Sequence, residues 1–424
     1  MSFTMLPKIS RRSFIGAGVA AAAAAGTLSW AYKARSSWDE AVGLVADPQG
    51  IIDLPPDFSY QVLQRVGDAM SDGFNAPSAP DGMACFPGEE DTWIIMRNHE
   101  IHKGTPVDSG FGAAPDRGGG VSRLVIDRAS AALRASNMVL TGTSRNCSGG
   151  PTPYGWLSCE EVEEAGHGYV FLCDPGASSV QAPHRLPALG RFPHEAAAFD
   201  PASGITYLSE DASQSAIYRH VPDSPEQPFV GGHLQALKVQ GQNRFDLSEG
   251  QKIGDQFAVE WANITDPTAA DTRTRTQAQQ RGGAIFSRGE GAWFDGSSVY
   301  LCSTDGGPKG RGQLYRLDIA KAAQTDTLTL IAQAQGDGDF DHPDNVTVSP
   351  WGDIFLAEDG DAPNGVRVLK PDGRLLYFAR NVMNDGDSEI TGICFSPDGK
   401  WMFLNIQWED LTLAITGPFM TLLA

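Results

Sequence analysis

One outline recurs six times along the chain, and this repetition constrains the fold more than any other feature. Each copy has a polar start, an apolar strand, a tight turn, a second apolar strand and an acidic or polar end. The six copies occupy residues 81–100, 146–161, 194–211, 289–305, 344–359 and 390–407. Their second strands end at Glu100, Glu160, Glu210, Asp305, Glu358 and Gln407. Most steps between these ends are about 50 residues long, and a strand-built repeat of that length indicates a β-propeller.

The predicted fold is therefore all-β: a six-bladed β-propeller with inserted loops and short helices, formed as one domain by residues 35–424. Connectors such as FDPASG, SPWGD and FSPDGK are typical hairpin turns, and 48 glycines and 27 prolines suit many short strands. The step from Glu210 to Asp305 is too long for one blade, so we expect an insertion at residues 222–285 that is helical in part. A seven-bladed propeller and a double sandwich are the alternatives.

The first residues of the chain predict an export signal rather than part of the fold. The stretch SRRSFIG at residues 10–16 contains Arg11 and Arg12, and an uncharged run rich in alanine and glycine follows. This pattern resembles a twin-arginine signal, so we expect residues 1–34 to direct the folded protein through the twin-arginine translocase to the periplasm or beyond. An uncleaved anchor and a structural helix are the alternatives. No later run is long and apolar enough to span a bilayer, so no stable membrane partner is expected.

The chain is strongly acidic, with 32 basic and 52 acidic residues and a formal net charge of −20. Such a surface does not attract nucleic acid or anionic membranes non-specifically, so neither is an expected partner. It does suit hard cations. The simpler interpretation, a solvated acidic surface, holds for most of these carboxylates.

Cysteine usage singles out one residue. The six cysteines are scattered singly, without a CxxC pair, and most lie in apolar runs such as GMACF, VYLCS and GICF. These are interpreted as small buried hydrophobic residues. Cys147 is different because it lies in a polar, glycine-flanked segment, RNCSGG.

The hairpin pattern predicts where the polar ends of the repeats meet. In an antiparallel hairpin the start of the first strand lies beside the end of the second, and in a propeller the inner strands surround the axis. The starts supply Asn146, Cys147, His194, Glu195, Arg288, Glu290, Asp344, Asn345 and Glu389. The ends supply Asn98, His99, Glu100, Glu160, Glu161, Glu210, Asp211, Asp305, Glu358 and Asp359. All should gather at one mouth of the central channel.

So many carboxylates cannot crowd together without cations, because their repulsion would raise their pKa values or unfold the site. The pattern therefore predicts a multi-metal centre. Oxygen ligands favour calcium, magnesium or iron, and a thiolate from Cys147 fits iron better than calcium alone. In this hypothesis Glu160 joins Cys147 from the neighbouring strand of the same hairpin.

Arg288, in SRGEG, is the only arginine that we place in this acidic ring. A guanidinium matches two phosphate oxygens, and metals with an arginine are the groups that phosphoryl transfer requires. The alternative is that Arg288 only pairs with Glu290 or another acid.

Several ordered segments resemble the bacterial PhoX-type alkaline phosphatases over nearly all of the mature chain: APDGMACFPG, RNHE, TSRNCSGGPTPYGWLSCEE, LGRFPHEAAAFDP, FSRGEG and LAEDG. The resemblance implies a six-bladed propeller, a twin-arginine signal, and a cofactor of two oxo-bridged ferric ions and three calcium ions. It implies that Cys147 ligates iron, that Glu195 and Glu290 are metal ligands, and that Arg288 contacts phosphate. The further expected metal ligands are Glu100, Glu160, Asp211, Glu210 and Glu358.

The leading functional prediction is an exported phosphomonoesterase that acts, as a monomer, on small-molecule phosphate esters. One alternative is a calcium-dependent propeller lactonase, because DNVTVSPWGDIFLAEDG resembles a blade of that kind and such a site needs neither Cys147 nor folded export. Another alternative is a non-enzymatic binding propeller that holds structural calcium.

Overall fold

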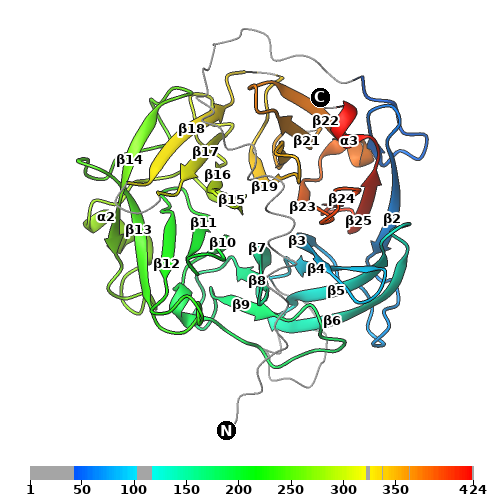
Figure 1. Cartoon of the computed structure of the whole chain (residues 1–424), viewed down its shortest axis with the longest axis horizontal. Helices are drawn as coiled ribbons and strands as arrows, with labels where there is room; N and C mark the ends of the chain where they lie inside the picture. The colour runs from blue at the N-terminus through cyan, green and yellow to red at the C-terminus, as the bar shows by residue number, and fades with distance from the viewer. Residues whose placement is uncertain (1–42, 103–116, 321–324, 337, 362, 423–424) are drawn as a thin grey trace.

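A computed structural model describes residues 43–102, 117–320, 325–336, 338–361 and 363–422. Fans of antiparallel strands surround a central axis (Figure 1), so the prediction of an all-β propeller is confirmed. Residues 1–42, which include the predicted signal, lie outside the described residues. No helix in the described part of the chain is long and apolar enough to cross a membrane.

Six inner strands line the axis, and each packs against the inner strand of the next blade around the ring. They are β3 (Pro80–Pro87), β7 (Asn146–Thr152), β10 (His194–Phe199), β15 (Gly289–Phe294), β19 (Pro343–Val348) and β23 (Ile390–Phe395). Their hairpin partners are β4 (Thr92–His99), β8 (Gly155–Glu160), β11 (Thr206–Glu210), β16 (Ser298–Ser303), β20 (Ile354–Glu358) and β24 (Trp401–Ile406). The six repeated segments of the sequence are these six hairpins.

Further strands complete each blade on its outer side. They are β5 (Gly119–Asp127), β6 (Leu133–Thr143), β9 (Val170–Cys173), β12 (Tyr218–Val221), β13 (His233–Val239), β14 (Gln256–Asn263), β17 (Gln313–Asp318), β18 (Thr327–Gln333), β21 (Gly365–Leu369), β22 (Leu375–Asn381) and β25 (Leu411–Thr416). Hydrogen bonds group the strands into five sheets rather than six. The reason is β14, which pairs with β13 on one side and β18 on the other and so joins two blades into one nine-stranded sheet.

The long repeat step holds β12, β13, β14 and the helix α2 (Thr274–Gln280). Three shorter helical pieces are η1 (Pro187–Leu189), η2 (Met383–Gly386) and α3 (Phe419–Leu422).

The ring closes through strands from the start of the described chain. β2 (Ser59–Arg65) pairs with β25 and completes the last blade, while β1 (Ile52–Asp53) pairs with β22 in the blade before it. The fully buried Arg97 ties this closure to the first blade, because it donates to Gln64 Oε1 at 2.6 Å and to Thr412 Oγ1 at 2.7 Å. Burial lowers the pKa of Arg97 to about 9.

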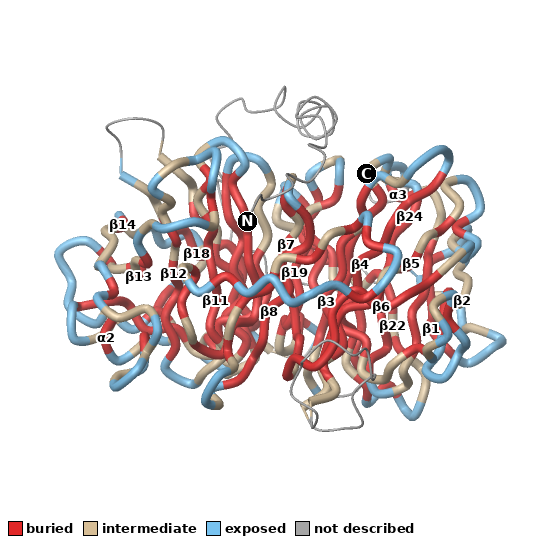
Figure 2. Tube along the Cα trace, turned by 90° about the horizontal axis from the view of Figure 1, so that it is seen from below, coloured by how far each residue is buried: buried red, intermediate tan, exposed pale blue. Residues whose placement is uncertain are grey.

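The strands are mostly buried (Figure 2), and the apolar core lies between the blades. One cluster packs Phe355 and Phe378 of one blade against Phe395 of the next. Near the axis the inner strands approach too closely for large side chains. A Cβ on Gly150 would lie 1.5 Å from the carbonyl oxygen of Ala197 on the adjacent blade, which only glycine avoids.

Candidate metal centre

The second residue of each inner strand lies at or beside a break in the strand pairing. In the first blade Pro80 pairs with His99, but the next regular pair is Met83 with Arg97. The other five blades have the same kind of irregularity near the start of the inner strand. A bulge bends the strand and re-aims the side chain at that point. The residues concerned are Asp81, Cys147, Glu195, Glu290, Asp344 and Thr391. We call the first five of these the inner ring, and all five side chains are buried.

A second set of side chains follows the ends of the hairpin partners. In each blade one backbone N–H donates to the carbonyl of the residue that precedes the inner strand, at 2.9–3.2 Å, which holds the two chain ends together. The donors are Glu100, Glu161, Asp211, Thr304, Asp359 and Gln407. We call these the outer ring. Starts and ends of the hairpins therefore do meet, as the strand pattern predicts.

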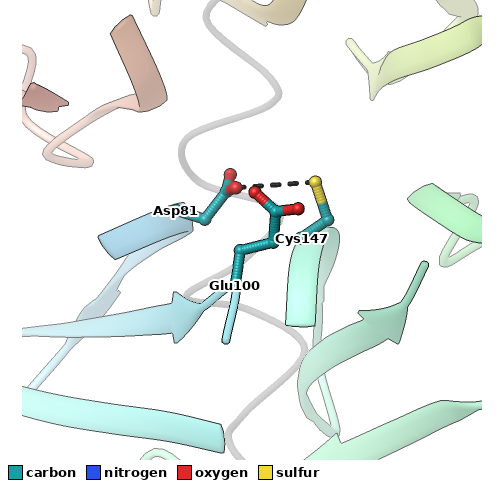
Figure 3. A group of neighbouring side chains, drawn as sticks. All are labelled: Asp81, Glu100 and Cys147. Carbon is teal, nitrogen blue, oxygen red and sulfur yellow. Dashed lines mark hydrogen bonds between the residues drawn. The ribbon is translucent and has the colours of Figure 1, made fainter. Parts of the chain in front are cut away.

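Cys147 lies among carboxylates from three blades. Its Sγ is 3.5 Å from Asp81 Oδ2, and Asp81, Glu100 and Cys147 place ligand atoms within 4.8 Å of one another (Figure 3). A second such group consists of Cys147, Glu161 and Glu195. The thiol is thus shared by two neighbouring sets of oxygen ligands, both at the blade junctions around β7.

The ring carries more negative charge than its own cations balance. Burial, together with Glu100 and Asp344, raises the pKa of Asp81 well above its usual range. Burial, together with Asp344, Glu161 and Asp81, does the same for Glu195. Burial also raises the pKa of Glu161, Asp344 and Glu389, and it raises the pKa of Asp359 to about 7. Burial and the charge of Asp81 raise the pKa of the Cys147 thiol.

Four inner-ring oxygens are buried and have no hydrogen-bond partner among the described residues: Asp81 Oδ1, Glu195 Oε1 and both carboxylate oxygens of Glu290, of which Oε1 forms an ion pair with Arg288. An unpaired buried carboxylate oxygen costs free energy that a bound cation would recover. Carboxylates with one thiol are a donor set for hard and borderline metal ions. The residues of the ring therefore fit a group of metal ions.

Arg288 lies directly before β15 with a left-handed backbone (φ 48°). Its Nε and Nη2 donate to the two oxygens of Asp211 at 3.0 and 3.2 Å, and Nη2 also pairs with Glu290. Burial opposes its charge, but Glu290 and Asp211 outweigh burial and raise its pKa. Arg288 is thus a fixed, charged guanidinium at the ring, with a third of its side chain exposed.

Glu160, Glu210 and Glu358, which we expected as metal ligands, are not brought to the ring. Each is the last residue of its strand, and side chains alternate between opposite faces along a strand, so its neighbour Glu161, Asp211 or Asp359 takes the ring position. Glu160 accepts from the N–H groups of Ser144, Gly168 and Tyr169 at 2.9–3.2 Å and contacts His167 Nδ1 at 2.7 Å.

The other two behave likewise. Glu210 accepts from Tyr218 and pairs with Arg275, and Glu358 accepts from Arg367 and the N–H of Asp341. Among the described residues the structure therefore groups Glu161, and not Glu160, with Cys147.

Three further groups at the predicted mouth are structural or lie outside the ring. His99 contacts Ser78 O and Ser122 Oγ, both at 2.8 Å. Burial lowers the pKa of His194 to about 3, and its Nε2 contacts Gly190 O at 3.2 Å. Asp305 lies one residue beyond the outer ring.

The sequence interpretation missed Asp81 and Arg145. Asp81 follows Pro80 as Asp344 follows Pro343, so the shared Pro-Asp at the start of a repeat was the available signal. Arg145 lies before β7 as Arg288 lies before β15, and it pairs with Glu100 and Glu161. The expectation that Arg288 is the only arginine of the ring was therefore wrong.

A cavity of about 630 Å³ adjoins one side of the rings. Its wall is formed by Glu100, His102, Arg145, Glu161, Val162, Glu163, Glu164, Pro193, Asp211, Ala212 and Arg275. Three of these are outer-ring carboxylates, so the cavity leads directly to the charged centre. Arg275 comes from α2, in the long segment between the third and fourth inner strands.

Comparison with known proteins identifies the family of the chain and solved structures of similar fold. A family model described as alkaline phosphatase PhoX matches residues 41–131 and 125–410. Among solved structures, Pseudomonas fluorescens PhoX in complex with vanadate, a transition state analogue, aligns with a TM-score of 0.67 at 18% identity, over 87% of this chain and 96% of that chain.

Two gluconolactonases align more loosely. Pseudomonas aeruginosa PpgL gives a TM-score of 0.44 at 15% identity, over 84% of this chain and 91% of that chain. Xanthomonas campestris XC5397 gives 0.39 at 12% identity, over 90% and 99%. Scores this low bear on neither fold nor function. No curated protein matches the chain.

Proposed function

Because the chain belongs to the PhoX alkaline phosphatase family, we propose that the two rings hold metal ions and that the site hydrolyses phosphate monoesters of small molecules. One observation supports this most strongly. A buried cluster of carboxylates and one thiol has oxygens without partners, and it lies beside a partly exposed arginine held by two of its acids. A phosphatase needs such a combination of cation-binding acids and an anion-binding guanidinium.

The ligand set that we propose differs from the one expected from the sequence. On the side of Cys147 the ligands are Asp81, Glu100, Glu161 and Glu195. Glu290, Asp344, Asp211 and Asp359 form the other side, where Asp344 contributes to the raised pKa of both Glu290 and Asp359. By resemblance to the family, we propose ferric iron beside the thiol and calcium among the remaining carboxylates. When bound, such ions polarise phosphoryl oxygens and balance the charge that develops on them.

The chain's own residues bind and orient the ester. Asp211 fixes the guanidinium plane of Arg288 through two hydrogen bonds, and Glu290 holds it from β15, the strand that Arg288 precedes. Among the described residues, Nη1 of Arg288 has no partner closer than Asp305 Oδ1 at 4.0 Å, so this donor is available to a phosphoryl oxygen. A guanidinium that is already oriented loses little freedom when it contacts the transition state.

We also propose that the protein is exported folded, through a twin-arginine signal within residues 1–34, and acts as a monomer in the periplasm or outside the cell. The ring gives a physical reason for folded export. Its ligands come from all around the propeller, so a metal can be chosen and bound only after the whole domain has folded.

The test is elemental analysis, with a visible spectrum, of protein exported through its own signal. We expect iron and calcium together, a visible absorption band from the thiolate, and hydrolysis of p-nitrophenyl phosphate. Calcium without iron or colour would contradict the thiolate–iron assignment. A fully metal-loaded protein that hydrolyses no phosphate monoester would contradict the proposed function.

A further inference from the structure

Arg145 and Arg288 occupy the same position in two different repeats. Each follows a serine and precedes a ring residue by two positions, in Ser-Arg-Asn-Cys and Ser-Arg-Gly-Glu. Each has a left-handed backbone, with φ of 47° and 48°. Each carbonyl accepts the N–H of the outer-ring residue in its own blade, from Glu161 to Arg145 and from Thr304 to Arg288. The local fold therefore aims two arginines in the same manner from two blades.

The two side chains are also held alike. Arg145 donates through Nε to Glu100 Oε1 at 2.8 Å and through Nη2 to Glu161 Oε2 at 2.7 Å. Arg288 donates through the same two atoms to Asp211 and pairs with Glu290 through Nη2. In both cases two acids clamp one edge of the guanidinium and fix its plane. Burial opposes the charge of Arg145, but Glu161 and Glu100 outweigh burial and raise its pKa, so it stays charged.

Arg145 lies in the wall of the cavity. Arg145 forms part of the cavity wall, 39% of its side chain is exposed, and its Nη1 has no hydrogen-bond partner among the described residues. The cavity begins at Glu100, Glu161 and Asp211, so a molecule that enters it toward the rings passes Arg145. Arg288 is not part of this wall.

We propose that Arg145 is a second substrate-contacting arginine, which binds an oxygen of the phosphate group from the cavity side while Arg288 binds from the far side of β10. The alcohol part of the ester then lies in the cavity. This inference rests on the proposed function. It assigns to Arg145 a role beyond balancing the charge of Glu100 and Glu161, because a purely structural arginine would not need a further donor in the wall of a cavity.

The test measures inorganic phosphate, both as a ligand by calorimetry and as an inhibitor of p-nitrophenyl phosphate hydrolysis. We compare the native protein with Arg145→Gln, Arg145→Lys and the control Arg134→Gln, whose arginine is exposed and pairs with Asp127 on the outer strands of the first blade. Losing one charged hydrogen bond should weaken phosphate binding about 10- to 100-fold in Arg145→Gln. Arg145→Lys should weaken it less, and Arg134→Gln should leave it unchanged. Metal content is measured on every sample.

The outcomes separate the two claims. If the native protein hydrolyses the ester and a metal-loaded Arg145 variant binds phosphate within about twofold of the native value, the role of Arg145 is overturned and the function stands. If the native protein binds phosphate through Arg145 but hydrolyses no monoester, the function is overturned and the contact stands. If both Arg145 variants lose their metals, Arg145 positions ligands and the proposal is wrong. If the native protein neither binds phosphate nor hydrolyses the ester, both claims fail.

Discussion

Three pairs of adjacent acids show how one chemical group takes two opposite roles in this propeller. In Glu160–Glu161, Glu210–Asp211 and Glu358–Asp359, the first acid anchors its own blade and the second belongs to the outer ring. Each anchor acid has a hydrogen-bonding basic partner: His167 for Glu160, Arg275 for Glu210 and Arg367 for Glu358. The ring acids face other acids, and the described cations nearby, mainly Arg145 and Arg288, balance only part of their charge.

The difference shows at which positions the stability of the fold depends on a bound cation. A carboxylate that the protein itself neutralises contributes to the stability of the fold. A carboxylate surrounded by other carboxylates lowers that stability unless a cation is bound. The comparison therefore predicts that equivalent substitutions at the two kinds of position will have opposite consequences.

The largest effect is expected from loss of a ring acid. Glu195→Gln keeps the shape of the side chain but removes one negative charge beside Cys147. We expect metal content to fall and phosphatase activity to drop by about 100-fold or more, because the proposed metal ions would supply most of the charge stabilisation in the transition state. Elemental analysis and kcat/KM for p-nitrophenyl phosphate measure this. Full metal content with normal kcat/KM would remove Glu195 from the centre.

Loss of an anchor should instead cost stability. Glu160→Ala leaves the N–H groups of Gly168 and Tyr169 and the ring of His167 without their acceptor in a buried place. We expect the free energy of unfolding to fall by about 2–4 kcal/mol. Metal content per folded molecule should remain close to native. Chemical denaturation checks the first point, and elemental analysis of the folded fraction checks the second. Stability unchanged but metal lost would mean that Glu160 is a ligand after all.

Removing bound metal should reverse the effect of a ring substitution on the free energy of unfolding. With a chelator present, the native ring acids repel one another, so Glu195→Gln should raise the unfolding free energy of the metal-free protein by about 1 kcal/mol. The same substitution should lower it in the metal-loaded protein. Thermal unfolding with and without chelator measures this reversal. A metal-free Glu195→Gln protein less stable than metal-free native protein would show that the ring is not strained by charge.

The smallest effect is on the pH dependence of stability, and it concerns only the anchor acid Glu160 and its partner His167. The hydrogen bond to Glu160 raises the pKa of His167 above its ordinary value of 6.5, against the opposing effect of burial. A raised folded-state pKa stabilises the fold fully below the unfolded value and loses that contribution as pH rises through the folded value. The stability difference between native protein and His167→Gln should therefore be largest below about pH 6.5 and shrink at higher pH. A difference that grows with pH would contradict this.

The sequence predicted the blades well because each hairpin carries its own pattern. The turn of FDPASG and the apolar runs on each side are local signals, and they placed the six hairpins correctly along the chain. The pairing of β14 with both β13 and β18 was not predictable, since it depends on how two blades lie side by side in space. The role of β2 in closing the ring is non-local for the same reason.

The sequence predicted where the site lies, but in three blades the structure brings the acid next to the predicted one to the ring. Choosing between Glu160 and Glu161 requires knowing which face of β8 turns toward the axis, and one residue of register decides it. Both are acids at the end of an apolar run, so composition gives no help. Arg145 was overlooked because its side chain is placed by its own left-handed backbone and by the bulge that follows it. Neither feature can be recognised in the sequence.

The pairing of β2 with β25 also has a consequence for how the protein is made. The ribosome makes the chain from its N-terminal side onward, so β2 emerges long before β25, the strand with which it pairs. Until then the ring remains an open arc, and the acids of the first blade have no neighbour on one side. The ring of acids is therefore complete only after β25 has been made, when the two ends of the arc meet.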